Sequence, residues 1–155
     1  MIVQVEFDID RDQHRVHIVL RGRFALQDIR ELVRRVHADA DWSPSMSALV
    51  DLRDAIGLDF STAAFMDLAH LLKYTVKTSA PGRTAIVVST DFMYGLGRMW
   101  EAYSSNTKYA SRVFRQYEAA EAWLDEEPSR VSDIAPAPGV AHLGWWERRG
   151  RGQAG

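Results

Sequence analysis

Apolar and polar residues alternate along the first part of the chain, with the period of two that half-buried strands show. One such run covers residues 3–7, and a second covers 16–20 after the polar stretch 8–15. Two alternating runs joined by a polar turn predict an antiparallel hairpin. Apolar residues then recur at helical spacing over 26–36, which predicts a helix that ends near His37.

The rest of the body alternates short apolar runs with helical patterns. The predicted strands are 48–52, 84–89 and 111–115, and the predicted helices are 65–76, 92–103 and 118–125. Asp91 is the predicted N-cap of the second of these helices. The predicted buried faces of the three helices are Phe65, Leu68, Ala69, Leu72 and Val76, then Phe92, Leu96, Met99, Trp100 and Tyr103, and finally Ala119, Ala122 and Trp123.

The resulting order, β-β-α-β-α-β-α-β-α, predicts an α/β fold. Strands that alternate with helices pair in parallel through right-handed crossovers, while the opening hairpin adds an antiparallel edge. We therefore expect one domain over residues 1–127, with a mixed, mostly parallel sheet of about five strands and about four helices.

A Pro- and Gly-rich tail is predicted over 128–155, and it holds Trp145 and Trp146 together with four arginines. Two adjacent indoles are costly to leave in water. We therefore expect residues 142–149 to dock on an apolar patch, either of the body or of a second copy of the chain.

Composition excludes several classes of function. The 155 residues include no cysteine, which excludes a disulfide framework, a thiolate metal site and a thiol nucleophile. The formal charge of −2 argues against general nucleic-acid binding, which needs a basic face for the phosphates. No signal peptide is recognisable, and no apolar run approaches the ~18 residues of a membrane helix. We expect a cytoplasmic protein with no membrane span.

The chain resembles the STAS domain of the bacterial anti-anti-sigma factor SpoIIAA, and more closely a group of bacterial SpoIIAA-like proteins. The segments that carry this resemblance are Val50-Asp51-Leu52-Arg53, Arg83-Thr84-Ala85-Ile86-Val87-Val88 with Gly95-Leu96-Gly97-Arg98-Met99, and Val113-Phe114-Arg115 with Ala122-Trp123-Leu124. The resemblance implies a STAS (SpoIIAA-like) fold and a regulatory, protein-binding module. That fold is also similar to the CRAL-TRIO lipid-carrier domain, which implies instead a carrier of a small apolar ligand.

The resemblance also indicates a place for a phosphorylation switch. Asp59 stands at the position of the family's Asp, but Phe60 occupies the position of its phosphorylated Ser. Ser61 matches the family's second hydroxyl and is the candidate for phosphorylation at a helix N-terminus. The alternative is that Ser61, Thr62 or Asp59 is simply the N-cap of that helix.

A polar rim is predicted at the carboxyl edge of the sheet, where ligands of open α/β sheets bind. Arg98 with Asp91, Tyr94 and Arg53 is the candidate set for a carboxylate or an acidic partner. The alternative is an ion pair of Arg98 with Asp51 or Asp91 that holds the helix to the sheet.

Gly95 and Gly97 do not form a dinucleotide motif, because Trp100 stands where the third glycine is needed. Either they let the helix pass close to the sheet, or they leave room for a ligand beside the aromatic cluster of this helix. In the second case, Gly97→Leu is expected to keep the fold and to displace the ligand.

No catalytic or metal site is expected. The histidines, at positions 14, 17, 37, 70 and 142, show no metal-ligand spacing and no nucleophile motif. We therefore expect a non-enzymatic module without cofactors that binds a protein partner, with a homodimer as a further expectation. The alternative is a carrier or sensor of a small hydrophobic ligand held between the second and third helices and the sheet.

Overall fold

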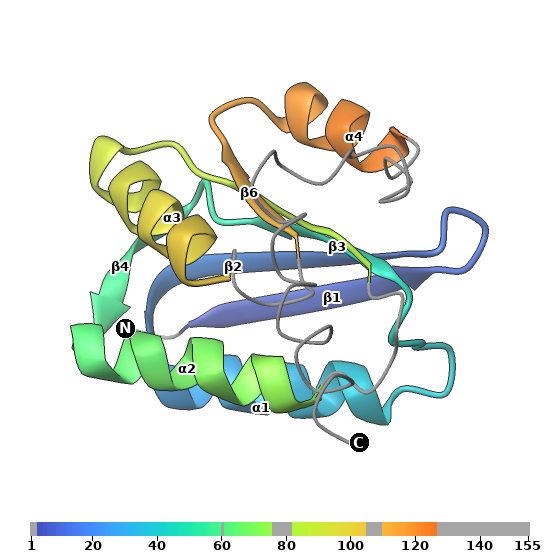
Figure 1. Ribbon diagram of the computed structural model, residues 1–155, viewed down its shortest axis with the longest axis horizontal. Coiled ribbons are helices and arrows are strands. Elements are labelled where there is room, and N and C mark those ends of the chain that lie inside the picture. Colours follow the sequence, from blue (N-terminus) through green and yellow to red (C-terminus); the bar gives the residue numbers. More distant parts are fainter. Residues whose placement is uncertain (1–2, 60, 76–81, 105–109, 127–155) are drawn as a thin grey trace, which may run out of the picture.

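Figure 1 shows the computed structural model of the chain, a twisted sheet with helices on both faces. It describes residues 3–59, 61–75, 82–104 and 110–126. The predicted tail 128–155, its docking segment and Val76 lie outside these residues. The strands are β1 (Gln4–Asp10), β2 (Arg15–Ala25), β3 (Ser47–Asp51), β4 (Ala55–Asp59), β5 (Thr84–Val87) and β6 (Ser111–Phe114), and the helices are α1 (Leu26–Ala38), α2 (Thr62–Thr75), α3 (Asp91–Ser104) and α4 (Tyr117–Asp125).

The sheet confirms the predicted fold class. Its main path runs β1-β2-β3-β5-β6, and β4 pairs with β2 beside this path. The pair β1 and β2 is antiparallel, with Gln4 opposite Arg21, and the other pairs are parallel. The predicted hairpin and the predicted parallel centre are therefore both present, and a helix connects most of the parallel strands.

The strand β4 is the element that the sequence did not predict. β2 continues past the predicted end at Leu20, and its far half pairs with β4 through Gly22–Ala25. The register shifts between Gly22 and Arg23, and Gly22 has a φ of 89°, in the left-handed region that favours glycine. Two arginines and this glycine interrupt the alternation of β2, so the pattern ends before the strand does. The sequence pattern therefore predicted no strand at Ala55–Asp59, where the structure has β4.

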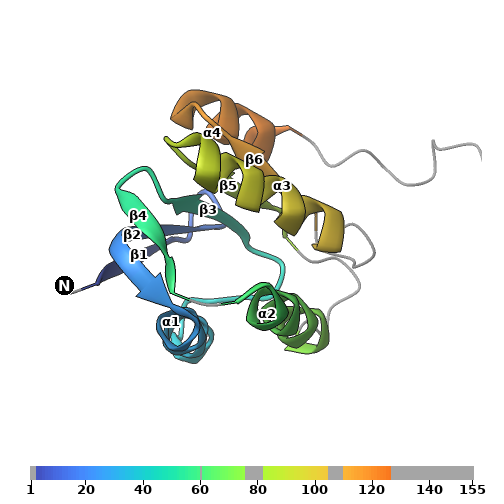
Figure 2. The same cartoon turned by 90° about the vertical axis from the view of Figure 1, so that its left-hand side faces the viewer.

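The helices divide between the two faces of the sheet (Figures 1 and 2). Of the described helices, only α4 covers one face, where Ala120 and Leu124 pack with Leu49, Ala85 and Val87 of the central strands. α1, α2 and α3 cover the other face and form the larger core. α4 is also held through charge, because the buried Arg15 of β2 donates to Asp125 at 2.7 Å.

The predicted faces of α3 and α4 need correction. Phe92 is 64% exposed, whereas its neighbour Met93 is buried at 4%. In α4, Ala119 and Ala122 are exposed, and the buried residues are Ala120 and Leu124. Both helices carry apolar residues on more than one side. The helical period of 3.6 residues therefore fits two neighbouring faces, and the predicted buried face was one residue away from the observed one.

The N-terminus of α3 also differs from the prediction. The hydroxyl of Thr90, not Asp91, accepts a hydrogen bond from the Met93 N–H at 3.2 Å and so caps the helix. Asp91 is the first helical residue and its carboxylate turns to another partner, described below.

Candidate functional site

The predicted polar rim at the carboxyl edge is divided into separate, internally paired groups. Arg53 makes a bidentate pair with Asp51, with Nη2 to Oδ2 at 2.7 Å and Nε to Oδ1 at 3.0 Å. Its guanidinium also lies over the Tyr117 ring at 4.9 Å, and its carbonyl accepts the Ser89 hydroxyl at 2.6 Å. The hydrogen bonds from Arg53 hold the pKa of Asp51 below its ordinary value. Both partners of this pair are thus satisfied within the chain.

Asp91 and Tyr94 belong to a second group, around Arg115. The Arg115 guanidinium lies 2.7 Å from the Asp91 carboxylate and 4.4 Å from the centre of the Tyr94 ring. Sequence reasoning missed Arg115 as a site residue, because it follows β6 and is far from α3 in sequence. Its place after a parallel strand was the available signal, since such residues gather at the same edge of the sheet.

Arg98 does not join either group. Its side chain is 63% exposed and pairs with Glu101 one turn along the same helix. The predicted ion pair of Arg98 with Asp51 or Asp91 is therefore wrong, because an acidic residue three positions away on the same helix face is nearer.

The region of the predicted phosphorylation switch forms a helix cap. The Ser61 hydroxyl accepts a hydrogen bond from the Ala64 N–H at 3.2 Å, the geometry of an N-cap of α2. Asp59 pairs with Arg23 at 2.8 Å across β4 and β2. Ser61 is therefore the N-cap of α2, as the alternative interpretation had it, and phosphorylation of Ser61 stays a prediction.

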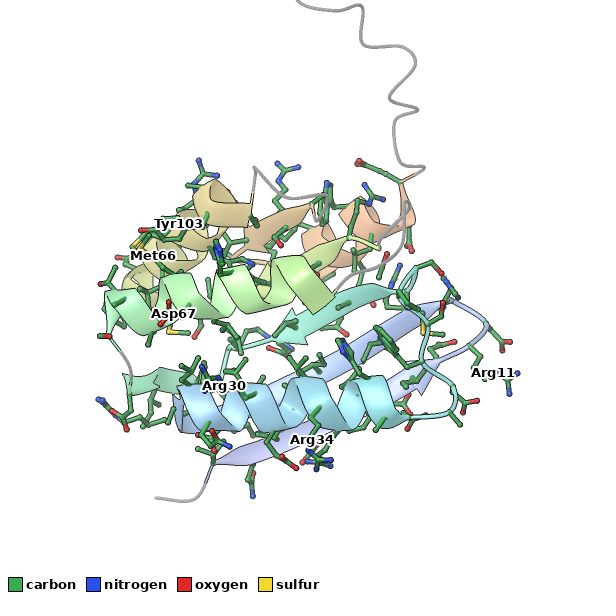
Figure 3. The ribbon with its side chains drawn as sticks, turned by 60° about the horizontal axis from the view of Figure 1, so that its bottom comes forward. Arg11, Arg30, Arg34, Met66, Asp67 and Tyr103 are labelled. Carbon is green, nitrogen blue, oxygen red and sulfur yellow. The ribbon has the colours of Figure 1, made fainter. Side chains whose placement is uncertain are left out.

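A cavity of about 260 Å³ lies between the sheet and the helices α1, α2 and α3. Figure 3 looks onto this side of the molecule, where α1 and α2 lie side by side across the sheet. Among the described residues that line the cavity none is Asp, Glu, Lys or Arg, and the polar ones are His37, Thr84, Ser104 and Ser111. The arrangement can therefore enclose an apolar molecule.

The sheet side of the cavity is made of rows of residues, because parallel strands in register align their side chains. The row at the amino ends of the strands is Val16, Ala48, Thr84 and Ser111. The next row holds the lining residues Ile18, Val50 and Ile86, and beyond it follow Leu20, Leu52 and Val88. Ile86 and Val50 are half-buried, in keeping with their place on a cavity wall.

Gly97 lets α3 pass close to the sheet, which is one of its two predicted roles, and it also borders the cavity. A Cβ built on Gly97 would lie 2.5 Å from Cγ2 of Val113, so the glycine allows α3 to touch β6 directly. Gly97 and Trp100 also line the cavity. The expectation that Gly97→Leu would leave the fold intact was wrong, because the added side chain would push α3 off the sheet.

The aromatic cluster of α3 contributes one ring to the cavity. Trp100 lines it and meets Phe65 of α2 edge to face, with ring centroids 5.4 Å apart. Tyr103 also contacts Phe65, at 6.2 Å, but is not part of the lining. These contacts join α2 to α3 along one side of the cavity.

His37 is a lining residue that sequence reasoning did not single out for binding. Its ring stacks on Trp42 with centroids 4.0 Å apart and planes at 24°. Burial lowers the pKa of His37 below its ordinary value, so the imidazole is neutral at pH 7. Its position near the end of a predicted helix gave no sign of the cavity.

Neither a metal centre nor a membrane span is present among the described residues. No group of three or more His, Asp or Glu side chains there can hold a metal ion. No described helix is long and apolar enough to cross a membrane.

Comparison with solved structures identifies the fold. The chain is similar to an uncharacterised protein of the DUF3478 family with a SpoIIAA-like fold, from Shewanella loihica PV-4. The TM-score is 0.53 at 21% sequence identity, and the match covers 80% of this chain and 96% of the other. The fold is SpoIIAA-like. No family model and no curated protein matches the sequence, so the function must be argued from the site itself.

Proposed function

We propose that this SpoIIAA-like protein binds a small apolar molecule in the cavity, without chemical turnover, as a carrier or sensor. The observation that carries the proposal is a cavity of about 260 Å³ whose described lining holds no charged residue. Ligand pockets of this kind are mostly apolar, with a few placed polar groups.

The size of the cavity indicates the size of the ligand. An apolar cavity of about 150 Å³ in another protein stays dry and takes up benzene. By proportion, the present cavity of about 260 Å³ suits a molecule of about ten non-hydrogen atoms. Removing the ligand surface from water is favourable by about 25 cal/mol per Å² of apolar area. Naphthalene is a probe of suitable size and rigidity.

Binding without turnover agrees with the chemistry of the wall. The described lining offers hydroxyls and one imidazole, but no carboxylate or ammonium group to serve with them as an acid or base. A non-enzymatic role therefore forms part of the proposal.

A second candidate function is protein binding at the carboxyl edge, as a regulatory module in the bacterial cytoplasm, alone or as a homodimer. It is favoured by the exposed ring of Phe92 and by two half-exposed guanidiniums, those of Arg53 and Arg115, which follow parallel strands at this edge of the sheet. Arginine and aromatic residues are enriched at protein interfaces. Against it, both arginines already have carboxylate partners within the chain.

The cavity proposal is tested by partly filling the cavity. Val50 lies in the second row of its wall, so we expect Val50→Phe to weaken naphthalene binding by about tenfold or more, the scale of an overpacking cost. Val19→Phe is the matched control, because Val19 lies between the lining residues Ile18 and Leu20 and faces the other side of the sheet. Binding is measured by fluorescence titration. Equal affinities of the two variants would contradict binding in this cavity.

A further inference from the structure

The wall of the cavity is polar at one end only. Of the sheet rows that line it, the first contains the hydroxyl residues Thr84 and Ser111, and the next two rows are wholly apolar. Because the first row stands at the amino ends of the strands, the polar end is opposite to the carboxyl edge where sequence reasoning expected a binding site.

The polar residues at this end are neighbours. Thr84 and Ser111 are register partners on β5 and β6, at a spacing of about 4.8 Å between adjacent strands. The Trp100 indole N–H donates to the Ser111 hydroxyl oxygen at 3.2 Å. Ser104 follows Trp100 by one helical turn and lines the same cavity, with its hydroxyl donating to the Glu101 carbonyl at 3.2 Å. Two strands and the end of α3 thus bring one indole N–H and three hydroxyls together.

The hydroxyls of Ser111 and Thr84 are the groups that can bind a ligand. A hydroxyl has one proton and two lone pairs, so Ser111, after accepting from Trp100, still has a proton to donate and a lone pair to accept. Thr84 adds a second hydroxyl on the adjacent strand. A ligand hydroxyl matches both the donor and the acceptor, and a ligand carbonyl oxygen matches the donor.

The same wall is unsuited to an anionic head group. No lysine or arginine is among the described lining residues, and burial lowers the pKa of His37, so this lining imidazole is neutral at pH 7. Arg30 and Arg34 of α1 are exposed, as Figure 3 shows, and neither lines the cavity. An unpaired carboxylate or phosphate buried here would lose its hydration without compensation.

We infer that the ligand is a neutral, largely apolar molecule with one hydroxyl or carbonyl group, which lies against Thr84 and Ser111 at the amino edge of the sheet. The inference rests on the proposed function, and it adds the class of ligand and the direction in which the ligand lies. A medium-chain alcohol or a small aromatic alcohol belongs to this class, whereas a carboxylic acid of the same size does not.

Three probes of similar shape test the charge of the ligand at pH 7: naphthalene, 2-naphthol and 2-naphthoate. We expect 2-naphthol to bind at least about tenfold more tightly than 2-naphthoate, because the buried anion has no partner. Equal or tighter binding of 2-naphthoate would overturn the inference and leave the proposed function standing. Failure of all three probes to bind the wild-type protein would overturn both.

Thr84→Val tests the position of the head group, since valine keeps the shape of threonine and removes the hydroxyl. We expect the variant to lose about twofold to tenfold in affinity for 2-naphthol, the scale of one hydrogen bond, and to keep its affinity for naphthalene. Thr62→Val, at the exposed start of α2, is the control and should change neither affinity. Circular dichroism checks that each variant is folded, and Ser111→Ala serves as the second variant if Thr84→Val is not. Loss of both affinities in equal measure, or of neither, would overturn the position of the head group.

Discussion

At the scale of single residues, the structure gives different roles to residues of the same type. Gly95 and Gly97 are equivalent in the sequence, but only Gly97 faces the sheet, and nothing lies within 4 Å of a Cβ built on Gly95. Arg98 is a conspicuous cation in the sequence, yet Arg115 is the one that reaches Asp91 and Tyr94. Which residue makes the contact depends on which side of a helix faces the sheet. An error of one residue in the predicted face therefore assigns the contact to the wrong residue.

The two glycines of α3 give opposite predictions for substitution by alanine. Gly97→Ala is expected to lower the free energy of unfolding by about 1–3 kcal/mol, because its Cβ would overlap Val113. Gly95→Ala is expected to raise it by up to about 1 kcal/mol, because alanine is the better helix former and the site is open. Urea denaturation of both variants measures the difference. A stabilising effect at Gly97 would contradict the close contact of α3 with β6.

His37 predicts a dependence of stability on pH. Burial lowers its pKa in the folded state, so at pH 7 and above the imidazole is neutral in both states and contributes no pH dependence. Below about pH 6.5, the usual pKa of histidine, the unfolded chain binds a proton that the folded chain resists. Stability is therefore lost as the pH falls from about 7 until the lower folded pKa is passed.

The matched variant is His37→Phe, which keeps an aromatic ring against Trp42 and removes the titrating group. Between pH 7 and pH 5, the wild type is expected to lose more unfolding free energy than this variant. Denaturant titrations at the two pH values provide the comparison. Equal losses would show that His37 does not carry the effect.

At the scale of elements, most of the fold could be predicted from the sequence. Alternation located β1 and the start of β2, and the apolar runs located β3, β5 and β6, because strands covered by helices need continuous apolar residues. β4 could not be found in this way. It is a short strand that pairs with the far half of β2. This pairing begins at Gly22, where β2 bends and the register shifts. Pairing over such a bend is a tertiary event that local periodicity does not record.

Gly22 is therefore expected to be critical for the pairing of β4. With a φ of 89°, it occupies a conformation that costs a residue with a side chain about 1–2 kcal/mol, so Gly22→Ala should lower the unfolding free energy by that amount. Gly57→Ala in β4 is the control, because its Cβ would meet the Arg23 side chain at an ordinary 3.5 Å. We expect that variant to stay within about 0.5 kcal/mol of the wild type. Thermal or urea unfolding of the two variants shows whether the loss of stability comes from the bend at Gly22 or from any substitution in the β2–β4 pair.

At the scale of the whole molecule, the cavity is the feature that sequence reasoning could describe only as an alternative. Most of the lining residues, such as Val16 and Ile86, have the apolar character of ordinary core residues. Whether such residues fill the space between sheet and helices depends on the distances between layers, which no local pattern contains. The polar end was missed for a related reason: Thr84 and Ser111 begin strands in the sequence, and only their register places them together.

The predicted docking of the tail is also a property of the whole chain. Residues 128–155 hold four arginines, two acidic residues and the pair Trp145 and Trp146. Truncation after Glu127 is expected to lower the melting temperature, or to change the oligomeric state measured by native mass spectrometry. If both are unchanged, the tail docks on nothing within this protein.

Partial filling of the cavity should separate stability from binding. A core with an empty apolar volume lacks contacts that a larger side chain can supply, and cavity-filling substitutions commonly add about 0.5–2 kcal/mol. Val50→Phe is therefore expected to raise the free energy of unfolding of the ligand-free protein by this amount, because Val50 borders the cavity of about 260 Å³. Naphthalene at a hundred times its dissociation constant should stabilise the wild type by about 2.7 kcal/mol and the variant by much less. Thermal unfolding with and without naphthalene measures both effects. A variant that is less stable than the wild type, and still stabilised by naphthalene, would mean that the space at Val50 is already filled and that the ligand binds elsewhere.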